Sequence, residues 1–406
     1  MPHNTNVTDV KPPYGGYPKV VSAGWNDNYL PLWMQDAGYN TYYVGKLWNT
    51  HTEDNYNKPY ARGFNGSDFL LDPWTYRYYY ARMTRNGAAP VAYDGNYSTD
   101  VISDKAAGFL DDALKHDRPW MLTVAPNAPH ANGSFSPQRN ATWFGEPEYA
   151  PRHANLFKGV KAPRGASFNK EIEGSVSWLQ RLPELNQTMI DYIDHFQRCR
   201  LRALRAVDEM IERLVHKLEK AGELDNTYIF FSTDNGYHLG QHKMQPGKDC
   251  GYGRSFLVQN FHCMDTHPML ETDINVPLVI RGPGIPKNQT LDVVTSHTDL
   301  APTFLSLANS KREGLDGKAI PATLRSSKAD NKTEHVAIEF WGTATEGIYG
   351  FASDHESWPD NRYANNTYKG IRLVSDSYSL YYSVWCTNEK EIYNLKVRVR
   401  SLIPRV

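Results

Sequence analysis

Residues 98–130, STDVISDKAAGFLDDALKHDRPWMLTVAPNAPH, contain the pattern on which the fold prediction depends. Apolar residues recur at helical spacing over residues 99–114, which predicts a helix with one apolar face. A short apolar run over residues 120–125 predicts a buried strand, and it leads directly into a loop that contains Asn127 and His130. The stretch therefore predicts a helix followed by a buried strand, with polar side chains where the strand ends.

The same order of elements recurs in two other parts of the chain. Residues 30–37 predict an amphipathic helix and residues 41–44 a strand that ends at Gly45 and Lys46. The longest predicted helix, residues 196–221, precedes an apolar strand within residues 227–236. Its predicted apolar face consists of Leu201, Leu204, Ile211, Leu214, Val215 and Leu218. Alternating helices and strands predict an α/β fold with a mixed, largely parallel sheet flanked by helices.

The pattern changes after about residue 320. Short strand-like runs over residues 335–342, 368–376, 379–385 and 391–395 are joined by turns, which predicts a small antiparallel sheet. We therefore predict an α/β domain over residues 1–320 and a smaller C-terminal α+β subdomain over residues 321–406.

The composition indicates a folded protein of the secretory pathway. The 406 residues carry a formal net charge of −1, which argues against nucleic acid as a partner. The sequence has no apolar run of about 18 residues that could span a membrane. Asn-x-Ser/Thr sequons along the whole chain predict glycosylation, and hence secretion or a lysosome-like compartment. These sequons begin at Asn6, Asn65, Asn96, Asn132, Asn140, Asn186, Asn288, Asn331 and Asn365.

Two further features bear on the secretory prediction. The chain begins MPHNTNVTDV, which lacks the basic and apolar regions of a signal peptide. Its four cysteines permit disulfides in that compartment, but their pairing does not follow from the sequence. They are Cys199, Cys250, Cys263 and Cys386.

Polar side chains follow three of the predicted strands. Lys46, His130 and Asp234 lie just beyond strand ends, and because ligand sites of such sheets lie at the carboxyl ends of the strands, we expect them on one rim. Asp234 and Asn235 offer oxygen ligands for a hard cation, although Asp-Asn-Gly is also a common turn. A lysine or histidine in a loop is, taken alone, more often a solvated residue. A second group in the same segment is predicted to be rim or surface residues: His238, His242 and Lys243.

Five stretches, in this order, resemble the sulfatase family of the alkaline phosphatase superfamily. They are AGYNTYYVGKLWN (37–49), APNAPH (125–130), STDNGYHLGQHKMQPGK (232–248), DINVPLVIRGPGIP (273–286) and SHTDLAPTFLSL (296–307). Within the family the resemblance is to arylsulfatases and N-acetylglucosamine-6-sulfatases, which are formylglycine-dependent sulfuric ester hydrolases. The ordered set covers most of the chain, although each piece alone is weak.

The resemblance implies roles for individual residues. Asp234 and Asn235 would bind Ca²⁺, and Lys46 and Lys248 would contact the sulfate oxygens. His130 matches a family histidine that bonds the ester oxygen and helps to protonate the leaving group. Many sulfatases have a histidine two residues after the first lysine; Trp48 stands there, so Asn49 is kept as a weak substitute in substrate binding.

The sequence also departs from the family pattern. The family nucleophile is a cysteine in a Cys-x-Pro-x-Arg segment, which is oxidised to formylglycine, and these 406 residues contain no such segment. The resemblance implies that this segment lies upstream, so we expect a chain truncated at its amino-terminal side. Residues 253–270 interrupt the family pattern and are interpreted as a translated intron. As a true insertion they would bring Cys263, His262 and His267 near the pocket as a metal-binding loop.

The sequence thus favours a sulfuric ester hydrolase for aryl or sugar sulfates, with the nucleophile segment missing. A phosphodiesterase or phosphonate hydrolase of the same superfamily is an alternative, but the Asp-Asn pair, in place of Asp-His, argues against it. A non-catalytic protein that binds sulfated glycans through the lysines is the second alternative. No prediction of oligomeric state follows.

Overall fold

The chain is built around a five-stranded mixed sheet of order β4-β3-β2-β1-β5. In this computed structural model β1 (Asn40–Gly45) pairs in parallel with β2 (Gly66–Leu70) and with β5 (Trp120–Ala125). The antiparallel strands β3 (Arg82–Arg85) and β4 (Val91–Ala92) extend the sheet beyond β2. The predicted strands at 41–44 and 120–125 are confirmed as neighbours, which places their carboxyl ends side by side.

The structure describes residues 2–136, 141–171, 174–248, 256–257, 272–290, 293–321, 334–341, 344–345, 362–363 and 367–396. Its short elements are α1 (Pro2–Thr5), η1 (Trp25–Asp27), β6 (Asn132–Ser136), β7 (Ala141–Gly145), η2 (Pro151–His153), α5 (Ser177–Gln180), η3 (Leu224–Asn226), β9 (Phe256–Leu257), β10 (Asn275–Val276), η4 (His297–Asp299), β13 (Ala344–Thr345) and β14 (Arg362–Tyr363). No helix in these ranges is long and apolar enough to cross a membrane.

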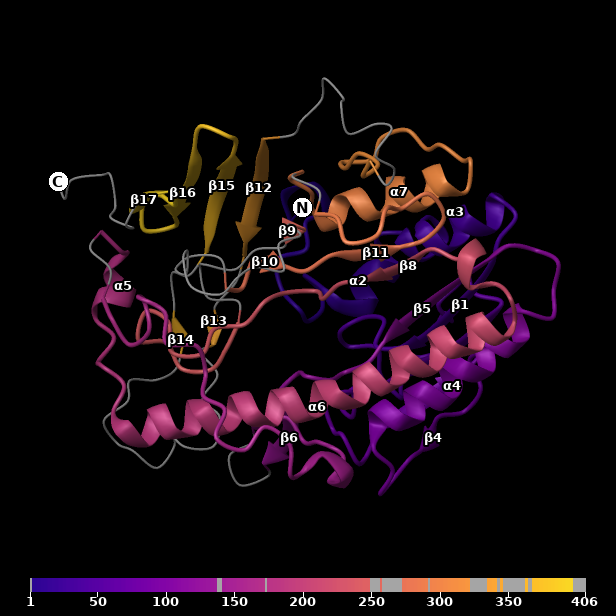
Figure 1. Cartoon of the computed structure of the whole chain (residues 1–406), viewed down its shortest axis with the longest axis horizontal. Helices are drawn as coiled ribbons and strands as arrows, with labels where there is room; N and C mark the ends of the chain where they lie inside the picture. Colours follow the sequence, from indigo (N-terminus) through magenta and orange to yellow (C-terminus); the bar gives the residue numbers. More distant parts are fainter. Residues whose placement is uncertain are drawn as a thin grey trace.

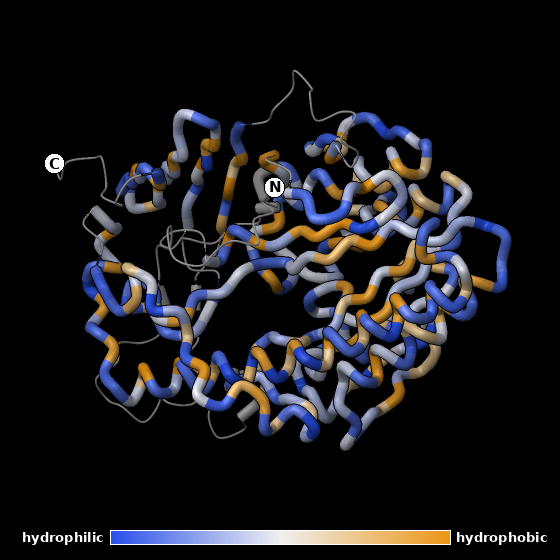
Figure 2. The backbone as a smooth tube through the Cα atoms, in the orientation of Figure 1, coloured by the Kyte–Doolittle hydropathy of each residue, from blue (hydrophilic) through white to orange (hydrophobic). Residues whose placement is uncertain are grey.

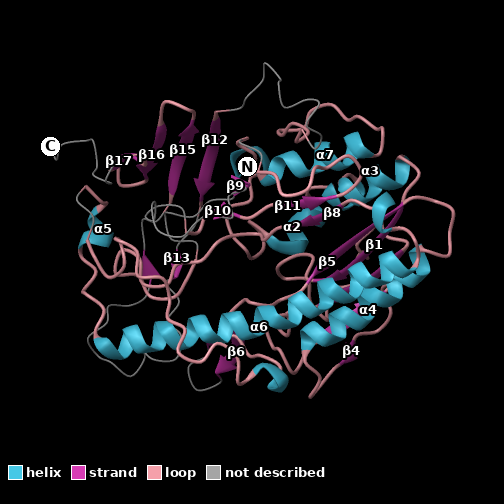
Figure 3. Ribbon diagram, viewed as in Figure 1, coloured by secondary structure: helices cyan, strands magenta, loops and turns pink. Residues whose placement is uncertain are grey.

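Helices lie on both sides of the strands (Figures 1 and 3). Tyr42 and Val44 of β1 pack in one apolar cluster with Phe109 of α4 (Ser98–Ala113) and Val207 of α6 (Gln187–Lys220). Tyr43, between them in sequence, packs in a second cluster with α2 (Gly16–Ser22). Because side chains alternate along a strand, this buries both faces of β1. The two remaining helices, α3 (Leu30–Asp36) and α7 (Leu300–Leu307), lie near each other beyond β1 (Figure 1).

The long helix α6 differs from its prediction in two ways. It begins at Gln187 rather than at residue 196, because Asn186 caps it: the Asn186 side chain accepts a hydrogen bond from the Met189 amide at 2.9 Å. Its buried residues in the main core are Ala203, Ala206, Val207 and Met210. Leu201 and Leu204 of the predicted apolar face are only half-buried. Ile193, Phe196 and Leu218 of α6 are buried as well, so the buried stripe matches the predicted one only in part. Figure 2 shows hydrophobic and hydrophilic residues alternating along α6.

The strand predicted after α6 does not join the parallel sheet. Strand β8 (Ile229–Phe231) pairs antiparallel with β11 (Val279–Arg281) as a separate two-stranded ladder. Phe230, Ile280 and Leu300 pack together around the buried Val276 and Leu278. A short apolar run does not encode which neighbour a strand will choose, so this pairing was not predictable from residues 227–236.

The C-terminal antiparallel sheet is confirmed. Its strands β12 (His335–Phe340), β15 (Tyr368–Val374), β16 (Ser379–Trp385) and β17 (Lys390–Asn394) pair antiparallel in that order. The inner face packs on Trp178, Leu182 and Met244. Figure 1 places this sheet at the far end of the molecule from α4. The domain division at residue 320 stays a prediction.

A buried glutamate joins the C-terminal sheet to the segment before α5. The fully buried Glu391 carboxylate accepts hydrogen bonds from the Val176 amide at 3.0 Å, Tyr393 at 2.9 Å, Ser383 at 3.1 Å and Trp385 at 3.0 Å. In Glu391→Gln one oxygen becomes an NH₂ group that faces donors, so we expect the free energy of unfolding to fall by about 2–3 kcal/mol. Urea unfolding measures this, and Glu389→Gln, at a half-exposed and less enclosed site, is the control. Equal losses in the two variants would contradict the expectation.

Candidate active site

The ends of β1 and β5 hold Lys46 and His130 close together. The Lys46 amide donates to the Ala125 carbonyl at 2.9 Å, so the two strands stay paired to their last residues. Gly45 allows this, because its φ is +108° and a Cβ there would lie 2.0 Å from the Ala125 oxygen. The glycine before Lys46 is therefore a steric requirement of this strand end.

Tyr76 links the lysine to the histidine. Its ring stacks on the His130 imidazole with 3.9 Å between centroids and a 20° interplanar angle. The Lys46 ammonium hydrogen-bonds the Tyr76 hydroxyl and lies 4.7 Å from that ring's centroid. His130 Nδ1 is 2.9 Å from the Ala131 carbonyl, so Nδ1 carries the proton in the neutral ring, and the His130 carbonyl accepts from Tyr78 at 2.7 Å. Both the ring and the backbone of His130 are thus oriented.

The segment after β8 adds the third part of the site. The Lys248 ammonium donates to the Asn235 side-chain oxygen at 3.1 Å, although the two residues are 13 positions apart. The loop between them closes on itself: His238 and Gly247 exchange backbone hydrogen bonds of 2.9 and 3.2 Å. Gly236 permits close contact with the neighbouring segment, because a Cβ there would lie 1.9 Å from the Thr272 carbonyl.

The charges of Lys248 and Lys46 both act on His130, so the loop that ends at Lys248 contributes to the electrostatics at the ends of β1 and β5. Burial, then Lys248, and then Lys46 and Arg200 hold the pKa of His130 well below its usual value. Tyr76 thus joins Lys46 to His130, and Lys248 is joined to Asn235, whereas the expected place of Asp234 on one rim with Lys46 and His130 stays a prediction. Asp234, next to Asn235, is exposed and accepts a hydrogen bond from the Asn235 amide at 2.9 Å.

Arg200 is a member of this cluster that the sequence reasoning missed. It projects from α6, donates to the Pro129 carbonyl at 3.2 Å, and its guanidinium lies 4.1 Å from the centroid of the Tyr237 ring. It therefore supports the cis-proline loop before His130 from one side and the loop after Asn235 from the other. Nothing in the helical pattern distinguishes Arg200 from its neighbours Arg198 and Arg202, so only its tertiary contacts identify it.

Asn49 is not brought into the cluster. Its backbone carbonyl accepts a hydrogen bond from the Tyr17 amide at 2.8 Å, and its half-buried side chain forms no hydrogen bond with any residue that the structure describes. Trp48, at the family's histidine position, packs into the apolar cluster around Tyr17 and Phe69. The role of Asn49 in substrate binding stays a prediction with no support from contacts.

The expected surface position of His238, His242 and Lys243 is wrong. Their exposed fractions are 0%, 2% and 6%. His238 Nδ1 pairs with the Asp273 carboxylate at 2.8 Å, the His242 amide donates to the Ser167 carbonyl at 2.9 Å, and Lys243 donates to the Gln180 carbonyl at 3.2 Å. The reason is that the loop 236–248 lies between segments 165–169 and 272–276, and local polarity does not reveal this.

The described residues supply part of a hard-cation site. The carboxylate of Asp234 and the amide oxygen of Asn235 are suitable ligand atoms for Ca²⁺, and they stand on adjacent residues at a strand end. No group of three or more His, Cys, Asp or Glu side chains within the described ranges could hold a metal ion. Asp234 and Asn235 therefore fit a metal as two of its ligands, and the remaining oxygens have to come from elsewhere.

The sequons differ in accessibility. Asn6, Asn65, Asn96, Asn186 and Asn288 are exposed, whereas Asn132 is half-buried. Asn186 is also the α6 cap, so this sequon has a structural use as well. Asn140, Asn331 and Asn365 lie outside the described residues, as do Cys250, Cys263, His262, His267 and most of the segment 253–270. Cys199 and Cys386 are free thiols.

The depressed pKa of His130 predicts an acid-side loss of stability. Below pH 6.5 the unfolded chain takes up a proton on this histidine that the native chain does not, so stability falls as pH falls. Between pH 7.5 and 5.5 we expect His130 to account for a loss of about 1 kcal/mol. Urea unfolding at both values should give a smaller loss for His130→Gln than for the parent chain, whereas His116→Gln, at an exposed site, should leave the loss unchanged. An unaltered loss in His130→Gln would contradict this assignment.

Comparison with known proteins identifies the family. Residues 1–310 match the family model described as Sulfatase. The chain belongs to the sulfatase family. It is 37% identical over 420 residues to an arylsulfatase of Volvox carteri, a match that covers 97% of this chain and 61% of that protein. It is also 31% identical over 383 residues to an N-acetylglucosamine-6-sulfatase of Capra hircus, covering 88% of this chain and 61% of that protein.

A solved structure supports the fold of this sulfatase chain. The protein BT4656, in complex with its substrate D-glucosamine-2-N,6-O-disulfate, superposes with a TM-score of 0.68 at 20% sequence identity. The superposition covers 98% of this chain and 79% of that one. The two curated relatives named above match 97% and 88% of this chain. The chain spans only 61% of the length of each of them. The resemblance seen in the five sequence stretches is thus confirmed at the level of family and fold.

Proposed function

We propose that this chain carries the sulfate-binding and acid-catalytic part of a sulfuric ester hydrolase for aryl or sugar sulfates. The observation that carries the proposal is the convergence of Lys46 and Lys248 on His130, with Arg200 behind them. Three cations around one imidazole form a positive site for a tetrahedral anion, and lysine ammonium groups suit sulfate oxygens as compact point charges. The names of the curated relatives support sulfate esters over other anions.

His130 is the residue best suited to act on the leaving group. Its Nδ1–H is held by the Ala131 carbonyl, so the other ring nitrogen, Nε2, is the atom that exchanges a proton with substrate. Without an anion, burial and then the neighbouring cations lower the pKa of His130 and favour the neutral imidazole. A bound sulfate ester would offset their charge and raise the His130 pKa, so that Nε2–H could donate to the departing alcohol oxygen. Tyr76, stacked on the ring, keeps it in this orientation.

Two groups that the family implies complete the site. Asp234 and Asn235 would contribute two oxygen ligands to Ca²⁺, which neutralises negative charge on the sulfate group when bound. The formylglycine nucleophile comes in the family from a Cys-x-Pro-x-Arg segment, which these 406 residues do not contain. The residues present can therefore bind and position a sulfate ester, while attack on sulfur needs a nucleophile that they do not supply.

The exposed sequons support a glycoprotein of the secretory pathway.

The single Asp-Asn pair remains the argument against a phosphodiesterase or phosphonate hydrolase. The positive cluster also suits a protein that binds sulfated glycans without turnover, which is the second candidate function. It differs from the first only in whether a nucleophile reaches the site.

The deciding experiment is turnover of a chromogenic aryl sulfate with added Ca²⁺. The 406-residue chain is compared with a chain joined at its amino terminus to a Cys-x-Pro-x-Arg segment of a sulfatase, lacking residues 253–270, and coexpressed with a formylglycine-generating enzyme. We expect activity only in the extended chain, and loss of that activity in its His130→Gln variant. Activity in the 406-residue chain would mean that another residue is the nucleophile. An extended, folded chain that binds sulfated sugars without turnover would favour the second function.

A further inference from the structure

A cavity of about 510 Å³ lies between α6 and the segment 145–149. It contains an imidazole, a thiol and two carboxylates, none of which the proposed hydrolase site uses. The residues of this cavity that carry the argument are Tyr79, Glu146, Glu148, Tyr149, His195 and Cys199.

The thiol and the imidazole form a hydrogen-bonded pair. His195 and Cys199 stand four positions apart on α6, so their side chains lie on the same helix face. His195 Nε2 is 3.5 Å from Cys199 Sγ and 3.4 Å from Glu146 Oε1, and the other Glu146 oxygen accepts from Tyr192 at 3.3 Å. The bond to Cys199 and then that to Glu146 raise the pKa of His195 to about 9. His195 Nε2 thus lies within hydrogen-bond distance of both the sulfur and a carboxylate.

The sulfur lies deep and the imidazole lies over it. Cys199 is 1% exposed, whereas the His195 side chain is 43% exposed and the Glu146 side chain 42%. A rotamer change of an exposed side chain takes picoseconds to nanoseconds, so movement of His195 gives access to the thiol. A thiolate beside an imidazolium is the reactive form of cysteine.

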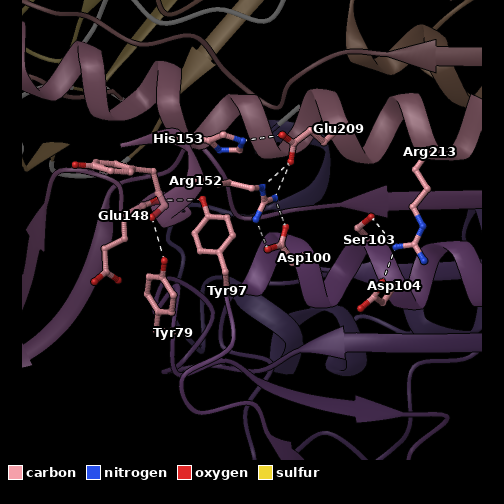
Figure 4. Close-up of polar contacts among 11 residues, drawn as sticks. Tyr79, Tyr97, Asp100, Ser103, Asp104, Glu148, Arg152, His153, Glu209 and Arg213 are labelled. Carbon is pink, nitrogen blue, oxygen red and sulfur yellow. Dashed lines mark hydrogen bonds and ion pairs between the residues drawn. The ribbon is translucent and has the colours of Figure 1, made fainter. Parts of the chain in front are cut away.

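The opposite wall of the cavity is fixed by a polar network (Figure 4). Tyr97 donates to the Glu148 carbonyl at 3.1 Å, and Tyr79 donates to the Tyr149 carbonyl at 3.0 Å. Arg152 then ties the segment to both long helices, with hydrogen bonds of 2.7 and 2.8 Å to Asp100 and of 2.7 and 2.9 Å to Glu209. The network therefore fixes the backbone of this wall at Glu148 and Tyr149. The cavity is lined by two carboxylates, those of Glu146, which pairs with His195, and Glu148.

We propose that Cys199 is a thiol-modification site that takes small, amine-bearing disulfides. The Cys199 thiol gives up its proton to water, and the thiolate attacks one sulfur of the disulfide. A new bond forms between Cys199 Sγ and that sulfur while the original S–S bond breaks. The released thiolate takes up a proton from water and leaves as a thiol. Cys199 is oxidised to a mixed disulfide, and one half of the reagent is reduced.

The acidic walls determine which disulfides are accepted. Glu148, and Glu146 beside it, attract an ammonium group and repel a carboxylate. The ring of Tyr79 also favours a cation, whereas the Tyr149 ring already has the Arg202 guanidinium 5.0 Å from its centroid. Cystamine, with two amines, should enter readily, whereas dithiodiacetic acid, with two carboxylates and a similar size, should not. A difference of about 1.4 kcal/mol between the two reagents corresponds to a tenfold ratio of rates.

The test compares these two reagents on the full chain. After timed reaction and quenching, peptide mapping by mass spectrometry measures modification of Cys199, with exposed Cys386 as the internal control. We expect cystamine to modify Cys199 at least about tenfold faster than dithiodiacetic acid does, with little preference at Cys386. In denaturant the preference at Cys199 should disappear. Cys199 that stays unmodified while Cys386 reacts, or equal rates for both reagents at Cys199, would overturn the proposal.

Two variants assign the roles. Glu148→Gln is expected to reduce the preference for cystamine, and His195→Gln is expected to slow both reagents at Cys199 by about tenfold. If His195→Gln fails to fold, the comparison of the two reagents on the parent chain still tests whether Cys199 is modified preferentially by cystamine. Because no readout involves sulfate, this test is independent of the proposed hydrolase function.

Discussion

Replacing Lys46 and Lys248 together by methionine is expected to weaken sulfate binding by at least about a hundredfold, because each charge-assisted contact contributes about 1.5–3 kcal/mol. Both ammonium groups act on His130 from different strand ends, so the pair surrounds the place where an anion would lie. Methionine keeps most of the side-chain length and removes the charge. Isothermal titration calorimetry of the 406-residue chain with N-acetylglucosamine 6-sulfate measures the effect without any need for turnover.

A matched control separates this local effect from the net charge. Lys11→Met/Lys115→Met removes the same two charges from exposed positions away from the cluster, and its affinity should stay within about twofold of the parent value. The single variants should each lose about tenfold or more. If the control pair lost as much affinity as Lys46→Met/Lys248→Met, binding would reflect the overall charge of the chain and not this site.

The second large effect concerns the His238–Asp273 pair. Both side chains are almost fully buried, at 0% and 1% exposure, and Nδ1 lies 2.8 Å from the carboxylate. His238→Ala leaves the Asp273 carboxylate buried without its imidazole partner, and breaking such a pair costs about 3–5 kcal/mol of the free energy of unfolding. The Asp273 backbone carbonyl also accepts a hydrogen bond from the Gly236 amide at 2.8 Å. The pair therefore supports the loop that carries Asn235 and Lys248.

Urea unfolding of His238→Ala measures the loss, and the exposed pair of Arg205 and Asp208 supplies the control. Those side chains are 41% and 63% exposed, so Asp208→Ala should cost at most about 0.5 kcal/mol. Because the loop is shared, His238→Ala should also weaken binding of N-acetylglucosamine 6-sulfate under conditions in which the variant is still folded. A loss no larger than in Asp208→Ala would show that the pair is not needed to hold the loop.

Residues 98–130 illustrate how far the sequence can be used. Their helical and apolar patterns predict α4 and β5 to within about a residue at each end, because amphipathic period and strand hydrophobicity are local properties. The position of His130 after β5 follows from the same stretch, and pairing of β5 with β1 then places it near Lys46. This part of the candidate site was therefore predictable once a parallel sheet was expected.

The loop 236–248 illustrates the opposite case. Its histidines and lysines look like surface residues, yet the loop is buried between segments from distant parts of the chain. Likewise, the sequence pattern predicts β8 as another parallel strand, but β8 pairs antiparallel with β11. In both cases the outcome depends on contacts with partners that a local pattern does not specify.

The sequence by itself determined the order of helices and strands, the C-terminal antiparallel sheet, the residues at the strand ends and the sulfatase resemblance. These depend on local periodicity and on short ordered motifs, which a single chain displays directly. Only the tertiary structure decided that Lys248 returns to Asn235, that Arg200 of α6 supports the His130 loop, and that Cys199 pairs with His195 in an acidic cavity. The physical reason is that each of these depends on how segments far apart in sequence pack together. That packing is set by the shape and burial of the whole core.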